Sequence, residues 1–222
     1  MSVAPESPMR QNAPAAFGGL VDAIGGVATA VLAICGLADI NPPVMIAAAT
    51  IIFGVALLLE GSACVAEFAQ IARSDRDAIE MEPGGNVAAV LLIGAAGIVL
   101  GVLALVGFNA GLLVPSAVIA FGVAMVLGSS LVPQLHAMRH AAHPGLAESR
   151  FAAREVLVSQ IASGSSVAQS LAGLAAIVLG ILALAGLNQP TLILVALLQL
   201  GVTLVVTGGA LTATLFGAMQ RR

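Results

Sequence analysis

The sequence predicts an all-α integral membrane protein whose six transmembrane helices form three parallel tandem hairpins. Of its 222 residues, 59% are hydrophobic and only 9% are charged, and the mean hydropathy is +1.08. A soluble domain carries about 25% charged residues, so this chain could not cover a water-facing surface with polar groups. We therefore expect lipid to surround most of it.

Six apolar runs reach the length of about 20 residues that a helix needs to cross a bilayer. None of them shows the strict alternation of a barrel strand, and a backbone in lipid must satisfy its own hydrogen bonds, so each run is predicted to be a helix. The runs lie at about 17–37, 43–63, 87–108, 112–133, 167–187 and 191–215.

The linkers between the runs are of two kinds. Segments 38–42, 109–111 and 188–190 are short and rich in Asn, Pro and Gly, which favour turns. Segments 67–86 and 134–166 are long and are expected to form cytoplasmic loops, with a short surface helix at 146–161. An N-terminal tail at 1–14, rich in proline, is expected to be disordered, so the membrane domain is predicted to span 15–222.

The arginines predict the orientation. The chain has no lysine, and all eight basic residues lie in the tail, in the long linkers or at the C-terminal end. Arginine near the end of a span stays on the cytoplasmic side. We therefore expect a multi-pass protein of the bacterial inner (plasma) membrane with both termini in the cytoplasm. The residues are Arg10, Arg73, Arg76, Arg139, Arg150, Arg154, Arg221 and Arg222.

The two cysteines are expected to remain free. Cys35 and Cys64 fall near the ends of the first and second runs, on opposite sides of the bilayer. A disulfide requires Cα atoms within about 7 Å, so these two thiols should not pair within one chain.

The apolar runs carry an internal repeat. Residues 96–107 (AGIVLGVLALVG) and 175–186 (AAIVLGILALAG) are identical at nine of twelve positions, and residues 25–36 (GGVATAVLAICG) align with both. This alignment places Gly36, Gly107 and Gly186 at equivalent outer positions. The second helices align through FGVALLLEG, FGVAMVLGS and LGVTLVVTG, which begin at 53, 121 and 200. The predicted hairpin units span about 17–66, 87–136 and 167–216.

Small residues recur four positions apart in the first helix of each unit. Lipid supplies no hydrophobic drive for helix association, so close backbone approach along small-residue faces is the expected packing device. Repetition in all three units favours packing within the chain, and homodimerisation through one face is the alternative. The predicted packing residues are Gly26, Ala30, Gly97, Gly101, Ala176 and Gly180.

Asp22 and Glu60 are the acids inside the predicted spans, both toward the cytoplasmic side of the first unit. An acid inside a span is costly and usually faces protein or water, so the pair is a candidate proton or cation site that opens inward. The alternative is two acids at the membrane edge that reach the headgroups. The repeat alignment places Ile93 and Ala172 opposite Asp22, and Gly128 and Thr207 opposite Glu60.

His136, His140 and His143 lie on one predicted helical face just inside the membrane. Imidazoles at this spacing can share a metal ion, and the alternative is three partly solvated interfacial histidines. We expect no bound metal and no cofactor.

No catalytic motif is present. The chain lacks a phosphate-binding glycine loop, a nucleophile elbow and an HExxH helix, so we expect it not to be an enzyme. Its scattered arginines form no basic stripe, and we expect no nucleic-acid partner.

The repeated hairpin with small-residue helices resembles the HdeD-type acid-resistance membrane proteins. The resemblance rests on IVLGVLALVG (98–107), IVLGILALAG (177–186) and TAVLAICG (29–36), and covers about 17–216. It implies a six-span bacterial inner-membrane protein linked to acid or envelope stress. The expected function is therefore non-enzymatic, through self-association or a membrane-protein partner in the bilayer. The alternative is a small transporter or channel with a proton- or cation-linked site near Asp22 and Glu60.

Overall fold

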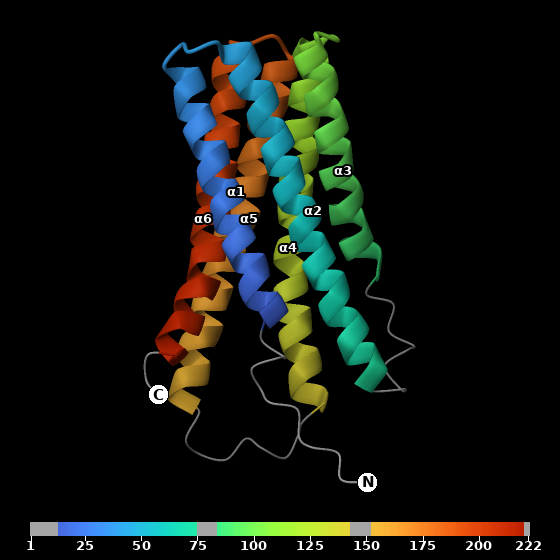
Figure 1. Cartoon of the computed structure of the whole chain (residues 1–222), viewed down its shortest axis with the longest axis vertical. Coiled ribbons are helices and arrows are strands. Elements are labelled where there is room, and N and C mark those ends of the chain that lie inside the picture. Colours follow the sequence, from blue (N-terminus) through green and yellow to red (C-terminus); the bar gives the residue numbers. More distant parts are fainter. Residues whose placement is uncertain (1–12, 75–83, 143–151, 220–222) are drawn as a thin grey trace.

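The computed structural model describes the backbone of residues 13–74, 84–142 and 152–219, and the side chains of 20–62, 65, 88–129 and 167–209 (Figure 1). Each of six long helices carries an apolar stretch long enough to cross a membrane. The predicted all-α membrane fold is therefore confirmed. The helices are α1 (Ala13–Leu37), α2 (Pro42–Ser74), α3 (Gly84–Val106), α4 (Ala110–Ala142), α5 (Ala152–Leu184) and α6 (Gln189–Met219).

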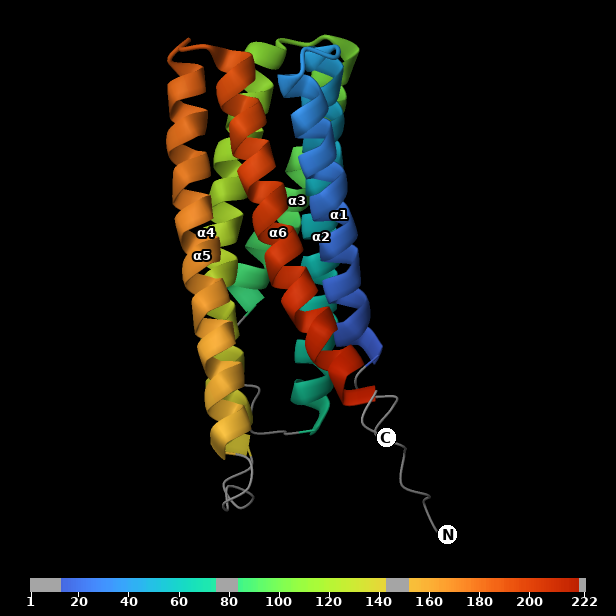
Figure 2. The ribbon, with the colours of Figure 1, turned by 90° about the vertical axis from the view of Figure 1, so that its left-hand side faces the viewer.

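The helices form a closed ring of three hairpins. Each helix packs against its neighbours in sequence, and α6 packs against α1 to close the ring. Helices α2, α4 and α6 also contact one another, so they form an inner group with α1, α3 and α5 outside it. Figures 1 and 2 show the three short turns at one end, called here the turn end. Helix α1 begins and α6 ends at the other end, called here the terminal end.

Several helices extend beyond the predicted spans. Helices α2, α4 and α5 each have 33 residues, which is about 50 Å of helix and exceeds a hydrocarbon core of about 30 Å. Within the predicted loops at 67–86 and 134–166, the described residues 67–74, 84–86, 134–142 and 152–166 are helical. The prediction of a separate surface helix at 146–161 is wrong for its described part, because α5 runs without a break from Ala152 into the fifth span. No proline interrupts this stretch.

The N-terminal tail also proves shorter than predicted, because α1 begins at Ala13. Pro14 occupies the first turn of the helix, where a missing N–H costs no hydrogen bond. The rest of the tail lies outside the described residues.

The three short turns share one backbone geometry. Asn41, Asn109 and Asn188 all have positive φ, of 45°, 27° and 37°. Two residues before each of them, Asp39, Gly107 and Gly186 also have positive φ, of 63°, 96° and 85°. Asparagine, aspartate and glycine are the residues that adopt this left-handed conformation at least cost. The turns therefore define which positions of the hairpins correspond.

This correspondence corrects the predicted alignment of the first helix by three residues. Asp39, not Gly36, matches Gly107 and Gly186. Gly36 lies inside α1, where a Cβ would meet Leu194 and Met45. The error arises because runs of Gly and Ala match one another in more than one register, whereas a positive φ occurs at one place in each turn.

With this register, the outer helices bury the same stripe in all three hairpins. The stripe recurs every three or four residues and consists mainly of small side chains, which let the helix backbones approach closely. Its members are Asp22, Gly26, Thr29, Ala33 and Gly36 in α1, Val90, Gly94, Gly97, Gly101 and Ala104 in α3, and Gln169, Gly173, Ala176, Gly180 and Ala183 in α5.

Paired glycines join each hairpin to the next. A Cβ added to Gly26 would lie 2.6 Å from the carbonyl oxygen of Gly201, so α1 and α6 touch backbone to backbone. The same contact joins Gly94 to Gly54 between α3 and α2. It also joins Gly173 to Gly122 between α5 and α4. Such close approach is the packing device that lipid-embedded helices favour.

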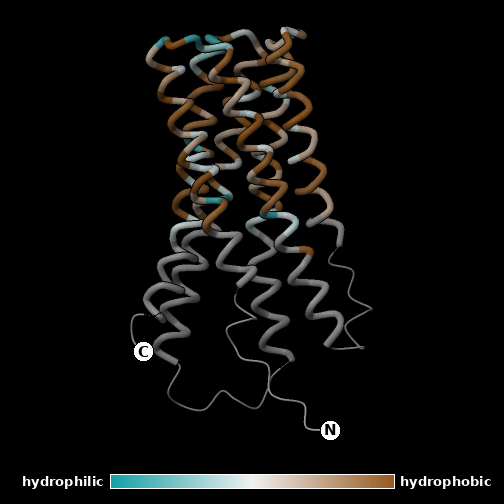
Figure 3. The backbone as a smooth tube through the Cα atoms, in the orientation of Figure 1, coloured by the Kyte–Doolittle hydropathy of each residue, from teal (hydrophilic) through white to brown (hydrophobic). Residues whose placement is uncertain are grey.

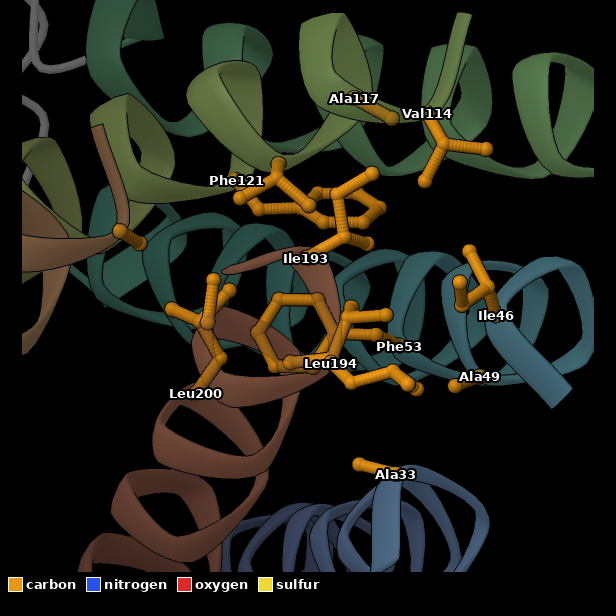
Figure 4. Close-up of a cluster of buried hydrophobic side chains, with 14 of the residues drawn as sticks. Ala33, Ile46, Ala49, Phe53, Val114, Ala117, Phe121, Ile193, Leu194 and Leu200 are labelled. Atoms are coloured by element: carbon orange, nitrogen blue, oxygen red, sulfur yellow. The ribbon is translucent and has the colours of Figure 1, made fainter. Parts of the chain in front are cut away.

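Apolar side chains fill the centre of the ring. Phe53, Phe121 and Leu200 occupy equivalent positions on α2, α4 and α6 and are fully buried (Figure 4). The two phenyl rings have centroids 4.8 Å apart and a tilted arrangement. The turns next to them on either side hold further buried apolar residues, among them Val118, Leu197, Leu57, Met125 and Leu204. Buried side chains therefore fill the axis of the bundle over these turns.

Candidate functional site

Asp22 lies at the terminal end of the buried stripe of α1. In the corrected register it corresponds to Val90 and Gln169, and not to Ile93 and Ala172 as predicted. All three corresponding residues are buried. The same structural position therefore holds an acid, an aliphatic residue and an amide in the three hairpins.

Two tight contacts of α1 place the Asp22 side chain. Gly25, three residues later, approaches α2 so closely that a Cβ there would lie 2.8 Å from the Ala56 Cβ. Gly26, four residues later, lies against Gly201 and Val205 of α6. Residues three and four apart share a helix face, so Asp22 lies one turn below both contacts. Its side chain consequently occupies the wedge between α2 and α6.

Glu60 reaches the same level from α2. It follows Ala56 by four residues, and α2 runs antiparallel to α1 within the hairpin. From the Gly25–Ala56 contact, Asp22 lies about 4.5 Å and Glu60 about 6 Å toward the terminal end, at 1.5 Å per residue. The Asp22 carboxyl lies within electrostatic reach of the Glu60 carboxyl. The structure thus brings together the two acids that the sequence singled out.

The environment of Asp22 offers no counter-charge. Asp22 is only 7% exposed, and its Oδ1 atom is fully buried without a hydrogen-bond partner. The side chains described by the structure include no Arg, Lys or His. Glu60 is half-buried. A buried carboxylate without a partner is costly, which makes this pair the unusual feature of the bundle.

Further polar side chains lie at this level in the other hairpins. Gln169 donates from Nε2 to Met125 Sδ at 3.5 Å, and Ser170 Oγ donates to Ser129 Oγ at 2.7 Å. Thr207, which corresponds to Glu60 in the repeat, donates its hydroxyl to the Thr203 carbonyl of its own helix, 3.0 Å away. Sequence reasoning missed the first two contacts, although a glutamine and serines inside an apolar span were the available signal.

Together these residues form a polar layer below the apolar centre, which consists of Asp22, Glu60, Ser129, Gln169, Ser170 and Thr207. Figure 3 shows the corresponding pattern along the chain: most of the bundle is hydrophobic, and hydrophilic segments gather at the turn end and again toward the terminal end. Only the acid pair in this layer includes a buried oxygen atom without a partner, among the described side chains.

The predicted packing residues lie at several different contacts. Gly26 and Ala30 face Gly201 of α6, and Gly97 lies under the ring of Phe121. Gly101 lies against Ala47 and Ile51 of α2, and Gly180 lies against Pro115 and Ile119 of α4; Ala176 is fully buried.

The two remaining predictions concern histidines and cysteines. His136 and His140 belong to α4, but their side chains, and all of His143, lie outside the described residues. The metal hypothesis therefore stays a prediction. Cys35 is a free, half-buried thiol, and the side chain of Cys64 lies outside the described residues.

Comparisons with protein families, with curated proteins and with solved structures find no match for this chain.

The chemistry of the acid pair allows it to bind a cation or to exchange a proton. Either positive charge removes the repulsion between two carboxylates in a medium of low dielectric constant.

Proposed function

We propose that this chain is a non-enzymatic inner-membrane protein that acts by association within the bilayer, with itself or with a membrane-protein partner. The observation that carries the proposal is the packed apolar centre around Phe53, Phe121 and Leu200. A filled axis offers no aqueous pathway at that level. The outer faces of α1, α3 and α5 then remain as the surface for interactions.

The resemblance to HdeD-type proteins supports a link to acid or envelope stress. The equal turn geometry and the three matching buried stripes support an internal triplication of one hairpin. A deletion strain should survive acid or envelope stress less well than its parent, and the cloned gene should restore survival. Normal survival of the deletion strain under both stresses would contradict this link.

Association has a matched set of test positions. Ile24, Leu92 and Leu171 occupy equivalent exposed positions on α1, α3 and α5, with 61%, 70% and 62% of their surface exposed. If the protein self-associates through one face, tryptophan at one of these positions should reduce cross-linked dimer while the other two leave it unchanged. If all three variants and the wild type remain monomeric in lipid, and affinity purification finds no partner, the association proposal is wrong.

The arginine pattern supports the orientation with both termini in the cytoplasm. A single cysteine replacing Asn109 or Asn188 in a chain without native cysteines should react with an impermeant reagent added outside. A cysteine replacing Ser74 should not. The reverse pattern would overturn the orientation.

A second candidate function is a small transporter with a proton- or cation-linked site at Asp22 and Glu60. The buried, unpartnered Asp22 Oδ1 favours it. Proteoliposomes with a trapped pH dye should then show a proton flux that Asp22→Asn abolishes. Equal flux in protein-free vesicles would remove this candidate.

A further inference from the structure

Asp22 of α1 and Glu60 of α2 form the site of the second candidate function, and the following inference rests on that function. We propose that Asp22 and Glu60 hold one exchangeable proton between their two carboxyl groups. We further propose that Glu60 passes this proton between Asp22 and water at the terminal end. The transfer makes an O–H bond on one carboxyl and breaks one on the other, so the pair keeps one proton and one negative charge.

The geometry of α1 requires something to neutralise this site. The Gly25–Ala56 contact fixes the spacing of α1 and α2 one turn above the acids, and the Gly26–Gly201 contact holds α6 on the other side of Asp22. Asp22 therefore cannot leave the wedge by a small helix movement. Two neighbouring carboxylates there would repel in a medium of low dielectric constant, and Asp22 Oδ1 receives no hydrogen bond to offset this.

No described neighbour supplies a positive charge. Helices α2 and α6 pack against α1, and α2 contributes Glu60 as the titratable group at this level. The described part of α6 contains no titratable side chain, and its polar residue that corresponds to Glu60 is Thr207.

A proton suits the site better than a metal ion. Hard cations such as Mg²⁺ or Ca²⁺ take six or more oxygen ligands. At this level the described side chains of α1, α2 and α6 include two carboxyl groups and the Thr207 hydroxyl, which donates to the Thr203 carbonyl, while the helix carbonyls are engaged in their own helices. A proton needs only two oxygens, and on Asp22 it would convert an unpartnered acceptor into a donor toward Glu60.

The positions of the two acids along the bundle set the direction from which the proton is exchanged. Toward the turn end the site is closed by the two glycine contacts and, above them, by the apolar centre. Glu60 lies one residue farther than Asp22 from the Gly25–Ala56 contact toward the terminal end, and it is the less buried of the two, so Glu60 is the member of the pair nearer to that end. A proton therefore enters and leaves through Glu60.

Infrared difference spectroscopy of the full chain in lipid nanodiscs tests the proposal. At neutral pH the wild type should show the C=O band of one protonated carboxyl group per chain. Asp22→Asn should remove the band, because Glu60 then loses its charged neighbour. Asp39→Asn is the matched control: it removes a carboxyl from the exposed turn, where asparagine tolerates the positive φ, and should leave the band unchanged.

Glu60→Gln tests the route. In this variant the C=O band should persist, because the proton stays on Asp22. The hydrogen–deuterium exchange of the Asp22 carboxyl should slow at least several-fold, because the Glu60 carboxyl can no longer carry the proton. Unchanged exchange would show that Glu60 is not part of the path and would overturn the shared site. Both variants are nearly isosteric, and wild-type-like thermal unfolding would establish that they fold.

Two further outcomes would overturn the proposal. The first is the absence of a protonated carboxyl in the wild type. The second is loss of the band when NaCl replaces choline chloride at constant pH, which would assign the site to sodium. The spectra are independent of the flux assay: a band without flux would keep the proton site and remove transport, and flux without a band would do the reverse.

Discussion

The half of the bundle next to the three short turns, called here the turn half, differs in composition from the polar layer. The polar layer lies one helical turn nearer to the terminal end than the Gly25 and Gly26 contacts. In the turn half, most equivalent positions of the three hairpins hold the same kind of residue: small residues in the stripes of α1, α3 and α5, and large apolar residues at Phe53, Phe121 and Leu200. Thr50 is an exception, because it stands where the other hairpins have Val118 and Leu197, and its hydroxyl donates to the Ile46 carbonyl of its own helix. In the polar layer, the positions equivalent to Asp22 hold Val90 and Gln169. Packing therefore constrains the first region uniformly, whereas in the second each hairpin carries its own chemistry.

This difference separates positions whose residue type is fixed by contacts between helix backbones from positions where the packing allows different side chains. A Gly–Gly contact between backbones leaves no room for variation, because any Cβ would overlap a carbonyl oxygen. Below it, the helices still touch but side chains fill the interface, so an acid, an amide or a valine can be accommodated. The acid pair thus lies at a level where the three hairpins differ in chemistry.

The largest effect is expected where backbones touch. Gly201→Val should destabilise the bundle by at least about 1–3 kcal/mol, because its Cβ would lie 2.8 Å from the Gly26 carbonyl oxygen and would separate α6 from α1. Gly209→Val in the same helix is the control, since a Cβ there meets nothing within 4 Å. Unfolding in mixed micelles measures both. Equal destabilisation by the two variants would show that the glycine contact does not hold the ring together.

The next effect has the opposite sign. Asp22→Val, which introduces the residue found at the equivalent position 90, should stabilise the fold by about 1–3 kcal/mol, because it removes a buried oxygen without a hydrogen-bond donor. Gln169→Val is the control: it removes the bond to Met125 Sδ and should not stabilise the fold. A destabilised Asp22→Val variant would show that Asp22 serves the fold and would weaken the distinction between the two regions.

A smaller effect is expected at the turns. Asn109→Ala should cost about 1 kcal/mol, because alanine adopts the positive φ of 27° less readily than asparagine. Asn109→Gly should be nearly neutral, since glycine adopts this conformation without strain. Thermal unfolding of both variants in detergent distinguishes them. Equal losses would show that the asparagine side chain, and not the backbone conformation, is what the turn requires.

The smallest effect is expected within the polar layer. Ser129→Ala removes the acceptor of the Ser170 hydroxyl, and interhelical hydrogen bonds in membranes contribute about 0.6 kcal/mol on average. The equivalent positions, Gly61 and Gly208, carry no hydroxyl, so this bond is particular to the α4–α5 interface. A loss comparable to that of Gly201→Val would show that the polar layer also holds the ring together.

Sequence alone determined the number and extent of the spans, because the apolar runs are long and lipid admits only helices there. It also identified Asp22 and Glu60, since an acid inside such a run is conspicuous. It misplaced the register of the first helix by three residues, because interchangeable Gly and Ala residues carry little positional information. It also missed the helical extensions of α2, α4 and α5, where polar residues fit a helix in water as well as a loop.

Tertiary structure decided what hydropathy cannot encode. That α6 closes the ring against α1 depends on contacts between helices far apart in sequence. That Gln169 corresponds to Asp22 follows from the backbone conformation of the three turns. The pairing of Asp22 with Glu60 depends on the Gly25–Ala56 crossing, which sets the level of two antiparallel helices. Hydropathy specifies which residues enter the membrane, but only close packing at particular small residues specifies which of them meet.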